Sequence, residues 1–180
     1  METPDLESLR YPIGKFVAPD NISRAKLDEW IDVLENFPSQ LSQLVSRLND
    51  DQLDTPYRPG GWTIRQVVHH VADSHHHSYI RFKWALTEDT PVIKYYYEHL
   101  WAELDDSKNA PIQMSLDHLT AVHFKLVYLL RLLNDNDFDR CFIHPEHNVK
   151  TPLRVNVGIY AWHSKHHYAH IKNLIERKGW

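Results

Sequence analysis

Histidine offers the most chemistry in this sequence, because the chain has 14 histidines among 180 residues. Four of them fall within residues 162–170, WHSKHHYAH. Residues four apart lie on one face of an α-helix, so His163 and His167 form one pair, and His166 and His170 form a second. Two imidazoles at this spacing can hold one divalent ion, as in the helical HExxH zinc motif. A serine stands where that motif has glutamate, so this segment is not the protease motif.

The apolar residues around these histidines indicate which pair faces inward. One helical face carries Ile159, Tyr160, His163, His167, Ile171, Leu174 and Ile175. His166 and His170 fall nearer to the edge of that face. We therefore expect His163 and His167 to point toward the core.

A third donor should come from another helix, and the segment VVHHVADSHHH is the obvious source. His70 lies three residues after Val67 and four before Ser74, on the apolar stripe. His69 is rotated from that stripe by about 100°. We predict that His70 is the third ligand, and that His77, two turns further along the same face, could line the cavity.

An alternative to the metal site stays open, in which the histidines have no ligand role. A helical histidine pair alone is more often a surface feature or a hydrogen-bonded part of the core. The second cluster adds weight to metal binding, because three buried neutral imidazoles need partners for their polar atoms. Histidines that satisfy one another would also meet that need. Five further histidines are interpreted as surface residues or neighbours of the site: His75, His76, His118, His144 and His147.

Three neutral imidazoles would leave the +2 charge of an ion uncompensated and its coordination open, as in catalytic zinc sites. Such an ion can lower the pKa of bound water to about 7. It can equally hold a thiol as the reactive thiolate. Imidazole suits zinc, nickel, copper and iron alike. The ligand set therefore leaves the metal and the nucleophile open, and no general base is assigned.

The helices that must position these residues follow from periodicity and capping signals. Ser23 is a plausible N-cap for an apolar stripe that runs to Leu48, with Pro38 expected to kink or divide that helix. Thr63 and Gln66 form a capping-box pattern, which predicts a helix over 63–86. Further helices are expected from Ser115 to about residue 133 and from Asn156 to Gly179.

The connections between these helices are unequal in length. Residues 87–111 show no clean period and predict a long crossover, with a short helical piece over 97–104. The alternating stretches CFIH and LRVNV, within residues 141–157, suggest a small β-hairpin. Four long helices with one long crossover predict an all-α four-helix bundle. We expect a single domain over 1–180, with an extended N-terminal arm over 1–22.

The charge and composition of the chain indicate which partners and which cellular compartment to expect. The formal net charge is −4, so neither nucleic acid nor an anionic membrane is expected as a partner. Cys141 is the only cysteine, the N-terminus lacks a secretory signal, and no apolar run approaches the ~20 residues that span a bilayer. A cytoplasmic protein acting on a small molecule is the expectation.

Three stretches carry a resemblance to a known family: YPIGKF, LDTPYRPGGWTIRQVVHHVADSHHHSYIRFKWALTEDTP and YAWHSKHHYAHI. From about Tyr11 to Trp180 the chain resembles the YfiT-type branch of the DinB-like superfamily. The resemblance implies a four-helix bundle, a homodimer, and one zinc or nickel ion on His70, His163 and His167. The SHHH run is richer in histidine than the family pattern, which leaves open whether His77 also approaches the metal.

The resemblance implies two activities. One is metal-dependent hydrolysis, and the other is S-transfer from a small thiol such as bacillithiol to an electrophile. A metal-binding stress-response module without catalysis is the third possibility. Residues that could support the site, or simply pack or face solvent, are Asp73, Tyr160, Trp62, Trp162, Arg65, Arg81, Arg154 and Lys165.

Overall fold

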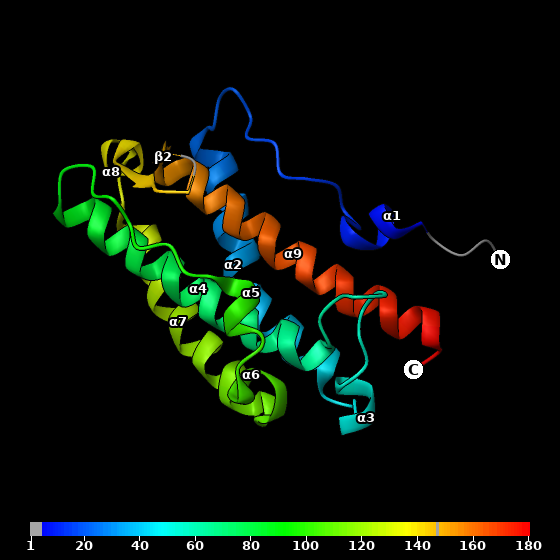
Figure 1. The fold of residues 1–180 in the computed structure, drawn as a ribbon. Coiled ribbons are helices and arrows are strands. Elements are labelled where there is room, and N and C mark those ends of the chain that lie inside the picture. The colour runs from blue at the N-terminus through cyan, green and yellow to red at the C-terminus, as the bar shows by residue number, and fades with distance from the viewer. Residues whose placement is uncertain (1–4, 147) are drawn as a thin grey trace.

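The computed structural model describes residues 5–146 and 148–180, and it is dominated by four long helices (Figure 1). They are α2 (Arg24–Val45), α4 (Ile64–Thr87), α7 (Ile112–Leu132) and α9 (Leu153–Lys178). α2 and α4 each pack against both α7 and α9. The predicted four-helix bundle is therefore confirmed.

The predicted caps explain where two of the helices begin. The Ser23 side chain accepts from the backbone N–H of Lys26 at the start of α2. Thr63 and Gln66 form the complete capping box of α4. α9 ends at Gly179, whose φ of 68° is the left-handed conformation that glycine adopts without strain.

Pro38 lies inside α2, and the helix continues through it to Val45 instead of dividing. Proline has no backbone N–H, so the Leu34 carbonyl, four residues earlier, loses its helical donor. The Nδ1 of His123 in α7 lies 2.6 Å from that oxygen and supplies a donor in its place. The proline therefore opens an acceptor inside the bundle.

The remaining elements are short and lie in the N-terminal arm and in the connections between the long helices. They are α1 (Leu6–Arg10), α3 (Asp50–Leu53), α5 (Glu98–Trp101), α6 (Asp105–Asn109), α8 (Asp135–Asp139), β1 (Cys141–His144) and β2 (Val149–Pro152). α5 and α6 belong to the long crossover and pack on α4. The arm expected to be extended contains α1, which has the Asp5 side chain as its N-cap.

The small hairpin exists, but its second strand is not the predicted one. β1 pairs antiparallel with β2, with Cys141 opposite Pro152. The stretch LRVNV begins α9 at Leu153 instead of forming a strand. Pro152 suits the position before a helix, and Leu153 and Val157 are both fully buried, as helical spacing allows.

The bundle interior has two apolar clusters and a set of buried polar residues. One cluster includes Leu34, Phe82 and Leu126, and the other includes Phe37 and Leu119. The buried polar residues include Ser74, Ser78, Ser164 and the histidines His70, His75, His123, His166, His167 and His170. The histidine chemistry therefore lies inside the bundle. No helix among the described residues has the length and apolarity needed to cross a membrane.

Candidate metal centre

His70 of α4 meets His163 and His167 of α9 in one cluster. The ligand nitrogens of the three residues all lie within 4.8 Å of one another. The Nε2 atoms of His70 and His163 are 3.3 Å apart. Zn–N bonds of about 2.0–2.1 Å at tetrahedral angles place two ligand nitrogens about 3.4 Å apart. The donor set therefore fits one divalent ion.

A chain of hydrogen bonds fixes which nitrogen of His163 faces the cluster. The Leu34 carbonyl can only accept, so Nδ1 of His123 donates to it across 2.6 Å. The Nε2 of neutral His123 then accepts from Nδ1 of His75, at 2.8 Å. The Nε2 of His75 in turn accepts from Nδ1 of His163, at 3.1 Å. This order leaves the lone pair of His163 on Nε2, directed at the cluster.

A second chain does the same for His167. The Nε2 of His170 lies 3.0 Å from the Arg10 carbonyl and must donate to it. The Nδ1 of His170 is then an acceptor, and Nδ1 of His167 donates to it across 3.4 Å. The Nε2 of His167 therefore also keeps its lone pair. His163 and His167 are each oriented by another histidine, His75 or His170, and each chain of hydrogen bonds ends at a backbone carbonyl.

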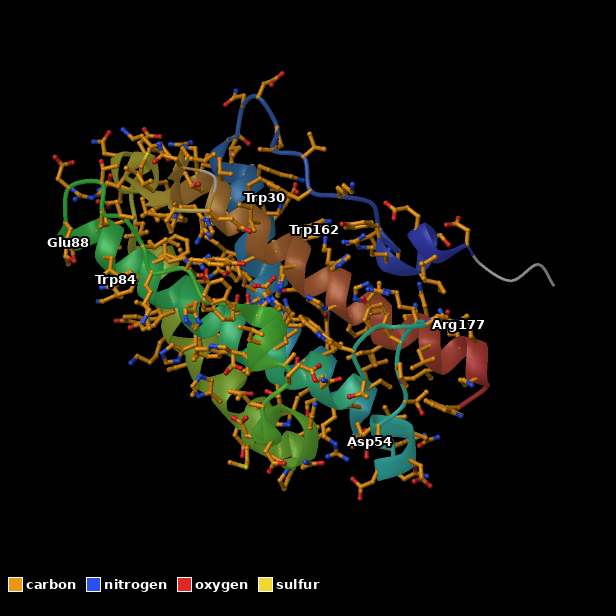
Figure 2. The ribbon with its side chains drawn as sticks, viewed as in Figure 1. Trp30, Asp54, Trp84, Glu88, Trp162 and Arg177 are labelled. Atoms are coloured by element: carbon orange, nitrogen blue, oxygen red, sulfur yellow. The ribbon has the colours of Figure 1, made fainter. Side chains whose placement is uncertain are left out.

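The N-terminal segment supplies the second of these carbonyls, and it lies along α9 (Figures 1 and 2). The indole Nε1 of Trp162 donates to the Gly14 carbonyl at 3.2 Å. Phe16 packs against the same indole, with ring centroids 6.5 Å apart. These contacts hold the arm beside the helix, so its role extends to the geometry of His170.

The electrostatics keep the imidazoles neutral. Burial is the main cause that lowers the pKa of His70 to about 3, and the electrostatic effects of the neighbouring His166 and His170 follow it. Burial likewise lowers the pKa values of His163 and His167 well below their ordinary range. Neutral imidazole is the form that binds metal, so the ligands need lose no proton at neutral pH.

A cavity of about 440 Å³ opens beside the cluster. His70, His163 and His167 line it together with Tyr160, Trp62, Trp162 and Arg81. The Tyr160 hydroxyl accepts from Arg81 Nη1 at 3.2 Å. A small molecule could therefore reach the face of the cluster that protein ligands leave open.

The structure places several other candidates away from the cluster. Asp73 faces a separate cavity with Asp106, and its pKa rises to about 6 through burial and that neighbouring carboxylate. His77 stacks on Tyr96, with ring centroids 4.1 Å apart, and its Nδ1 bonds to the Asp73 carbonyl. Neither side chain lines the cavity beside the three histidines.

The remaining candidates are also accounted for. His76 pairs with His118 across 2.9 Å. Arg65 and Arg154 form ion pairs with aspartates. Lys165 lines a different cavity between α2 and α9. His147 lies outside the described residues.

His75 was expected at the surface or beside the site, and the structure places it beside the site, fully buried and in contact with His163. The roles of His123, His170 and the Arg10 carbonyl were not predicted. Two signals were available. His75 lies four residues after Val71 and seven before Phe82, on a helical stripe that is buried. His123 lies on the apolar stripe of the third helix, where a polar side chain requires a partner.

The fold and the three-imidazole cluster define a four-helix bundle with a candidate metal centre in its middle. The DinB superfamily model matches residues 34–171. A Bacillus subtilis relative named "Putative metal-dependent hydrolase YfiT" is 51% identical over 173 residues, 96% of this chain and 97% of the relative. A Bacillus mycoides (strain KBAB4) protein of the same description is 50% identical over 175 residues, 97% of this chain and 100% of that relative. The chain belongs to the DinB superfamily.

Solved structures agree with this assignment. The structure of YfiT from Bacillus subtilis, described as a probable metal-dependent hydrolase with an unusual four-helix bundle topology, matches with a TM-score of 0.94. That match covers 96% of this chain and 99% of the other at 51% identity. The four-helix bundle protein TT2238 matches with a TM-score of 0.55 over 82% of this chain and 98% of the other, at 20% identity. The second likeness concerns the fold alone.

Proposed function

We propose that this protein is a metal-dependent enzyme that uses His70, His163 and His167 to hold one divalent ion, zinc or nickel. The order of the hydrogen bonds among the buried histidines carries the proposal. It assigns to His163 and His167 the tautomer that aims Nε2 at His70, beside a cavity of about 440 Å³. Histidines that merely filled space would not need both lone pairs directed at one point.

We propose further that the activated nucleophile is a small thiol, transferred to an electrophile. When bound, the ion would favour the deprotonated form of an acidic ligand at its open position. The chain's own residues would bind the reactants and orient the ligands. The ring centroid of Trp62 lies 4.7 Å from that of His70, and the ring centroid of Tyr160 lies 5.6 Å from that of His163. A thiol, whose ordinary pKa is about 8.5, needs less help from a base than water does.

Hydrolysis is the second candidate, and a specific observation favours it. Glu98 and Glu146 line the same cavity, so carboxylates are present that could act on water. The names of the Bacillus relatives point in the same direction.

Metal binding is tested first, by elemental analysis of the purified protein. We expect one divalent ion per chain, lost in His167→Ala and retained in His76→Ala. A protein that carries no stoichiometric metal after exposure to zinc and nickel would contradict the proposal. It would favour the alternative that His70 donates from Nε2 to His163 across the 3.3 Å contact.

Activity is tested next, by incubating the metal-loaded protein with bacillithiol and a chromogenic electrophile. Metal-dependent conjugate above background supports S-transfer. Metal-dependent turnover of esters or amides without thiol supports hydrolysis. Stoichiometric metal without either reaction would favour a non-catalytic metal-binding module.

We also propose a homodimer. The exposed side chains Phe124, Tyr128 and Leu132 recur every four residues along α7, which forms an apolar stripe on the outside of the bundle. Light scattering should give twice the chain mass of 21.3 kDa. Phe124→Glu should shift it to the monomer value, and a monomeric parent protein would contradict the proposal.

A further inference from the structure

Arg81 of α4 is a buried cation at the candidate metal centre. It lies three helical turns beyond His70, is only 8% exposed, and lines the same cavity as His70 and His163. Charged side chains are almost never buried to this extent without a counter-charge. The partners of Arg81 therefore matter for what the cavity can bind.

The guanidinium has little to pair with in the part of the chain that the structure describes. Nη1 donates to the Tyr160 hydroxyl at 3.2 Å, whereas Nε is buried without a hydrogen-bond partner. Arg81 forms no ion pair with any described carboxylate. Arg65, the other arginine buried to this degree, shows the contrast, because it reaches Asp54 at 2.6 Å and Asp50 at 2.8 Å.

The neighbouring groups do not neutralise Arg81. The histidines around it are neutral, and a divalent ion on them would add positive charge. Glu98 and Glu146 line the cavity, but neither forms an ion pair with Arg81, and Glu98 accepts from the Tyr95 hydroxyl at 3.3 Å. The cavity thus holds an unpaired cation beside a site for another one.

We propose that Arg81 binds an oxyanion group, a carboxylate or a phosphate, of the small molecule that reacts at the three-histidine centre. Tyr160 holds Nη1 of the guanidinium, and Nη2, which has no hydrogen-bond partner among the described residues and is not covered as Nε is, is left for the ligand, as suits the recognition of oxyanions by arginine. The inference rests on the proposed function and adds to it the charge class of the substrate. It also explains why an unpaired charge is kept in the core, since the ligand completes the pair.

The test measures binding of matched probes by calorimetry, on zinc-loaded and on metal-free protein. The thiol pair is 3-mercaptopropionate and 3-mercaptopropanol, and the thiol-free pair is succinamate and succinamide. Inorganic phosphate is the fifth titrant. We expect charged probes to bind about 10- to 100-fold more tightly than neutral ones, as for a charge-assisted pair in a buried site. The pair that shows the preference identifies the reactant that carries the anion, and tight binding of phosphate alone identifies a phosphate group.

The matched variants are Arg81→Met, which keeps length without charge, Arg81→Lys, which keeps charge without the fork, and Arg47→Met at an exposed arginine. Arg81→Met should remove the charge preference, Arg81→Lys should reduce it, and Arg47→Met should keep it. If charged probes bind no better than neutral ones to the parent protein, or if the preference survives in Arg81→Met, the inference is wrong.

Thermal unfolding separates a ligand-binding role from a structural one. Without ligand, Arg81→Met should unfold at the same or a higher temperature than the parent, because the substitution removes an unpaired buried charge. Succinamate or phosphate should raise the unfolding temperature of the parent and not that of Arg81→Met. A variant that is destabilised yet keeps its anion affinity would assign Arg81 to structure and overturn the inference.

Failure of the Arg81 anion site and failure of the proposed metal-dependent function would give different experimental results. Metal content is measured independently, and the metal-free protein still contains Arg81. A charge preference without stoichiometric metal would retain the anion site and reject the metal-dependent reaction. Turnover on a metal-loaded protein that shows no charge preference would reject the anion site alone.

Discussion

Nε2 of His75 accepts from Nδ1 of His163 across 3.1 Å, which makes a fully buried histidine the partner of a candidate metal ligand. The acceptor has its own tautomer set by His123 and, through it, by the carbonyl of Leu34. That carbonyl is open because Pro38 has no N–H to offer it. A single proline in α2 is thereby linked to the direction of a lone pair in α9.

The first prediction concerns His75 and metal affinity. His75→Leu should weaken zinc binding about 10- to 100-fold, because partners that orient a ligand typically contribute that much. His75→Gln should retain most of the affinity, since its amide can accept from His163 and donate to His123. Competition with a fluorescent zinc chelator measures both.

His76→Gln serves as the control, because His76 pairs with His118 on the outer side of α4. Ring ¹⁵N spectra of the metal-free parent should show His163 protonated at Nδ1. Equal affinities for the parent protein and His75→Leu would show that the hydrogen bond does not orient His163.

The second prediction concerns His170 and the N-terminal segment. His170→Leu removes the acceptor of His167 Nδ1, so zinc affinity should fall about tenfold or more. His170 also stacks on Tyr57 with ring centroids 4.0 Å apart, and leucine retains much of that apolar contact. The exposed Lys172→Ala is the matched control on the same helix. An unchanged affinity in His170→Leu would leave the Arg10 carbonyl without a role at the metal centre.

The sequence alone predicted the parts of the structure that depend on local physics. The cap at Ser23, the capping box at Thr63 and the apolar stripes gave the four helices, because these signals act within one or two turns. The facing histidines on α9 followed from the same periodicity. The start of α9 was missed by three residues because alternating apolar residues in LRVNV also fit a short strand.

The partners of the metal ligands could not be predicted in the same way. In a helix with one buried stripe, the period of the apolar residues tells which of two adjacent histidines is buried. α4 is covered on several faces, by α7, α9 and the crossover, so this rule fails there. His69 and His70 are consequently both buried, and His69 bonds to Ser115 at 2.7 Å. Asp73, the carboxylate nearest to His70 in sequence, faces a separate cavity, whereas His163 is oriented by His75, which the packing of α4 on α9 places beside it.

The third prediction concerns pH. Burial lowers the pKa of His123 to about 4, below its ordinary value of 6.5, so the folded state favours neutral His123. The unfolded chain binds this proton below pH 6.5 and the folded chain only near pH 4. The contribution of His123 to stability is therefore present above pH 6.5 and is lost as the pH falls toward 4.

His123→Gln can donate to Leu34 and accept from His75 without titrating. In metal-free protein at pH 5, this variant should take up about one proton fewer on unfolding than the parent does. Guanidinium unfolding between pH 4 and 8 gives that number from the slope of the unfolding free energy against pH. Identical slopes for the two proteins would contradict the buried, neutral state of His123.

The fourth prediction concerns the packing of α9 on α2 at Gly158. A methyl group there would lie 2.7 Å from Cη2 of Trp30 and 3.0 Å from Cζ of Phe16. Replacing glycine by alanine inside a helix normally stabilises the protein by about 0.5–1 kcal/mol. Overpacking against a buried indole costs about 1–3 kcal/mol, so Gly158→Ala should destabilise the protein. A double-mutant cycle with Trp30→Phe, which lacks the clashing ring atoms, should show that the two losses are less than additive in urea unfolding. A Gly158→Ala protein that is more stable than the parent, or strictly additive losses of unfolding free energy, would contradict this prediction. Either result would mean that α9 can move away from α2 without loss of stability. The hydrogen-bonded histidines would then be less tightly held than the structure indicates.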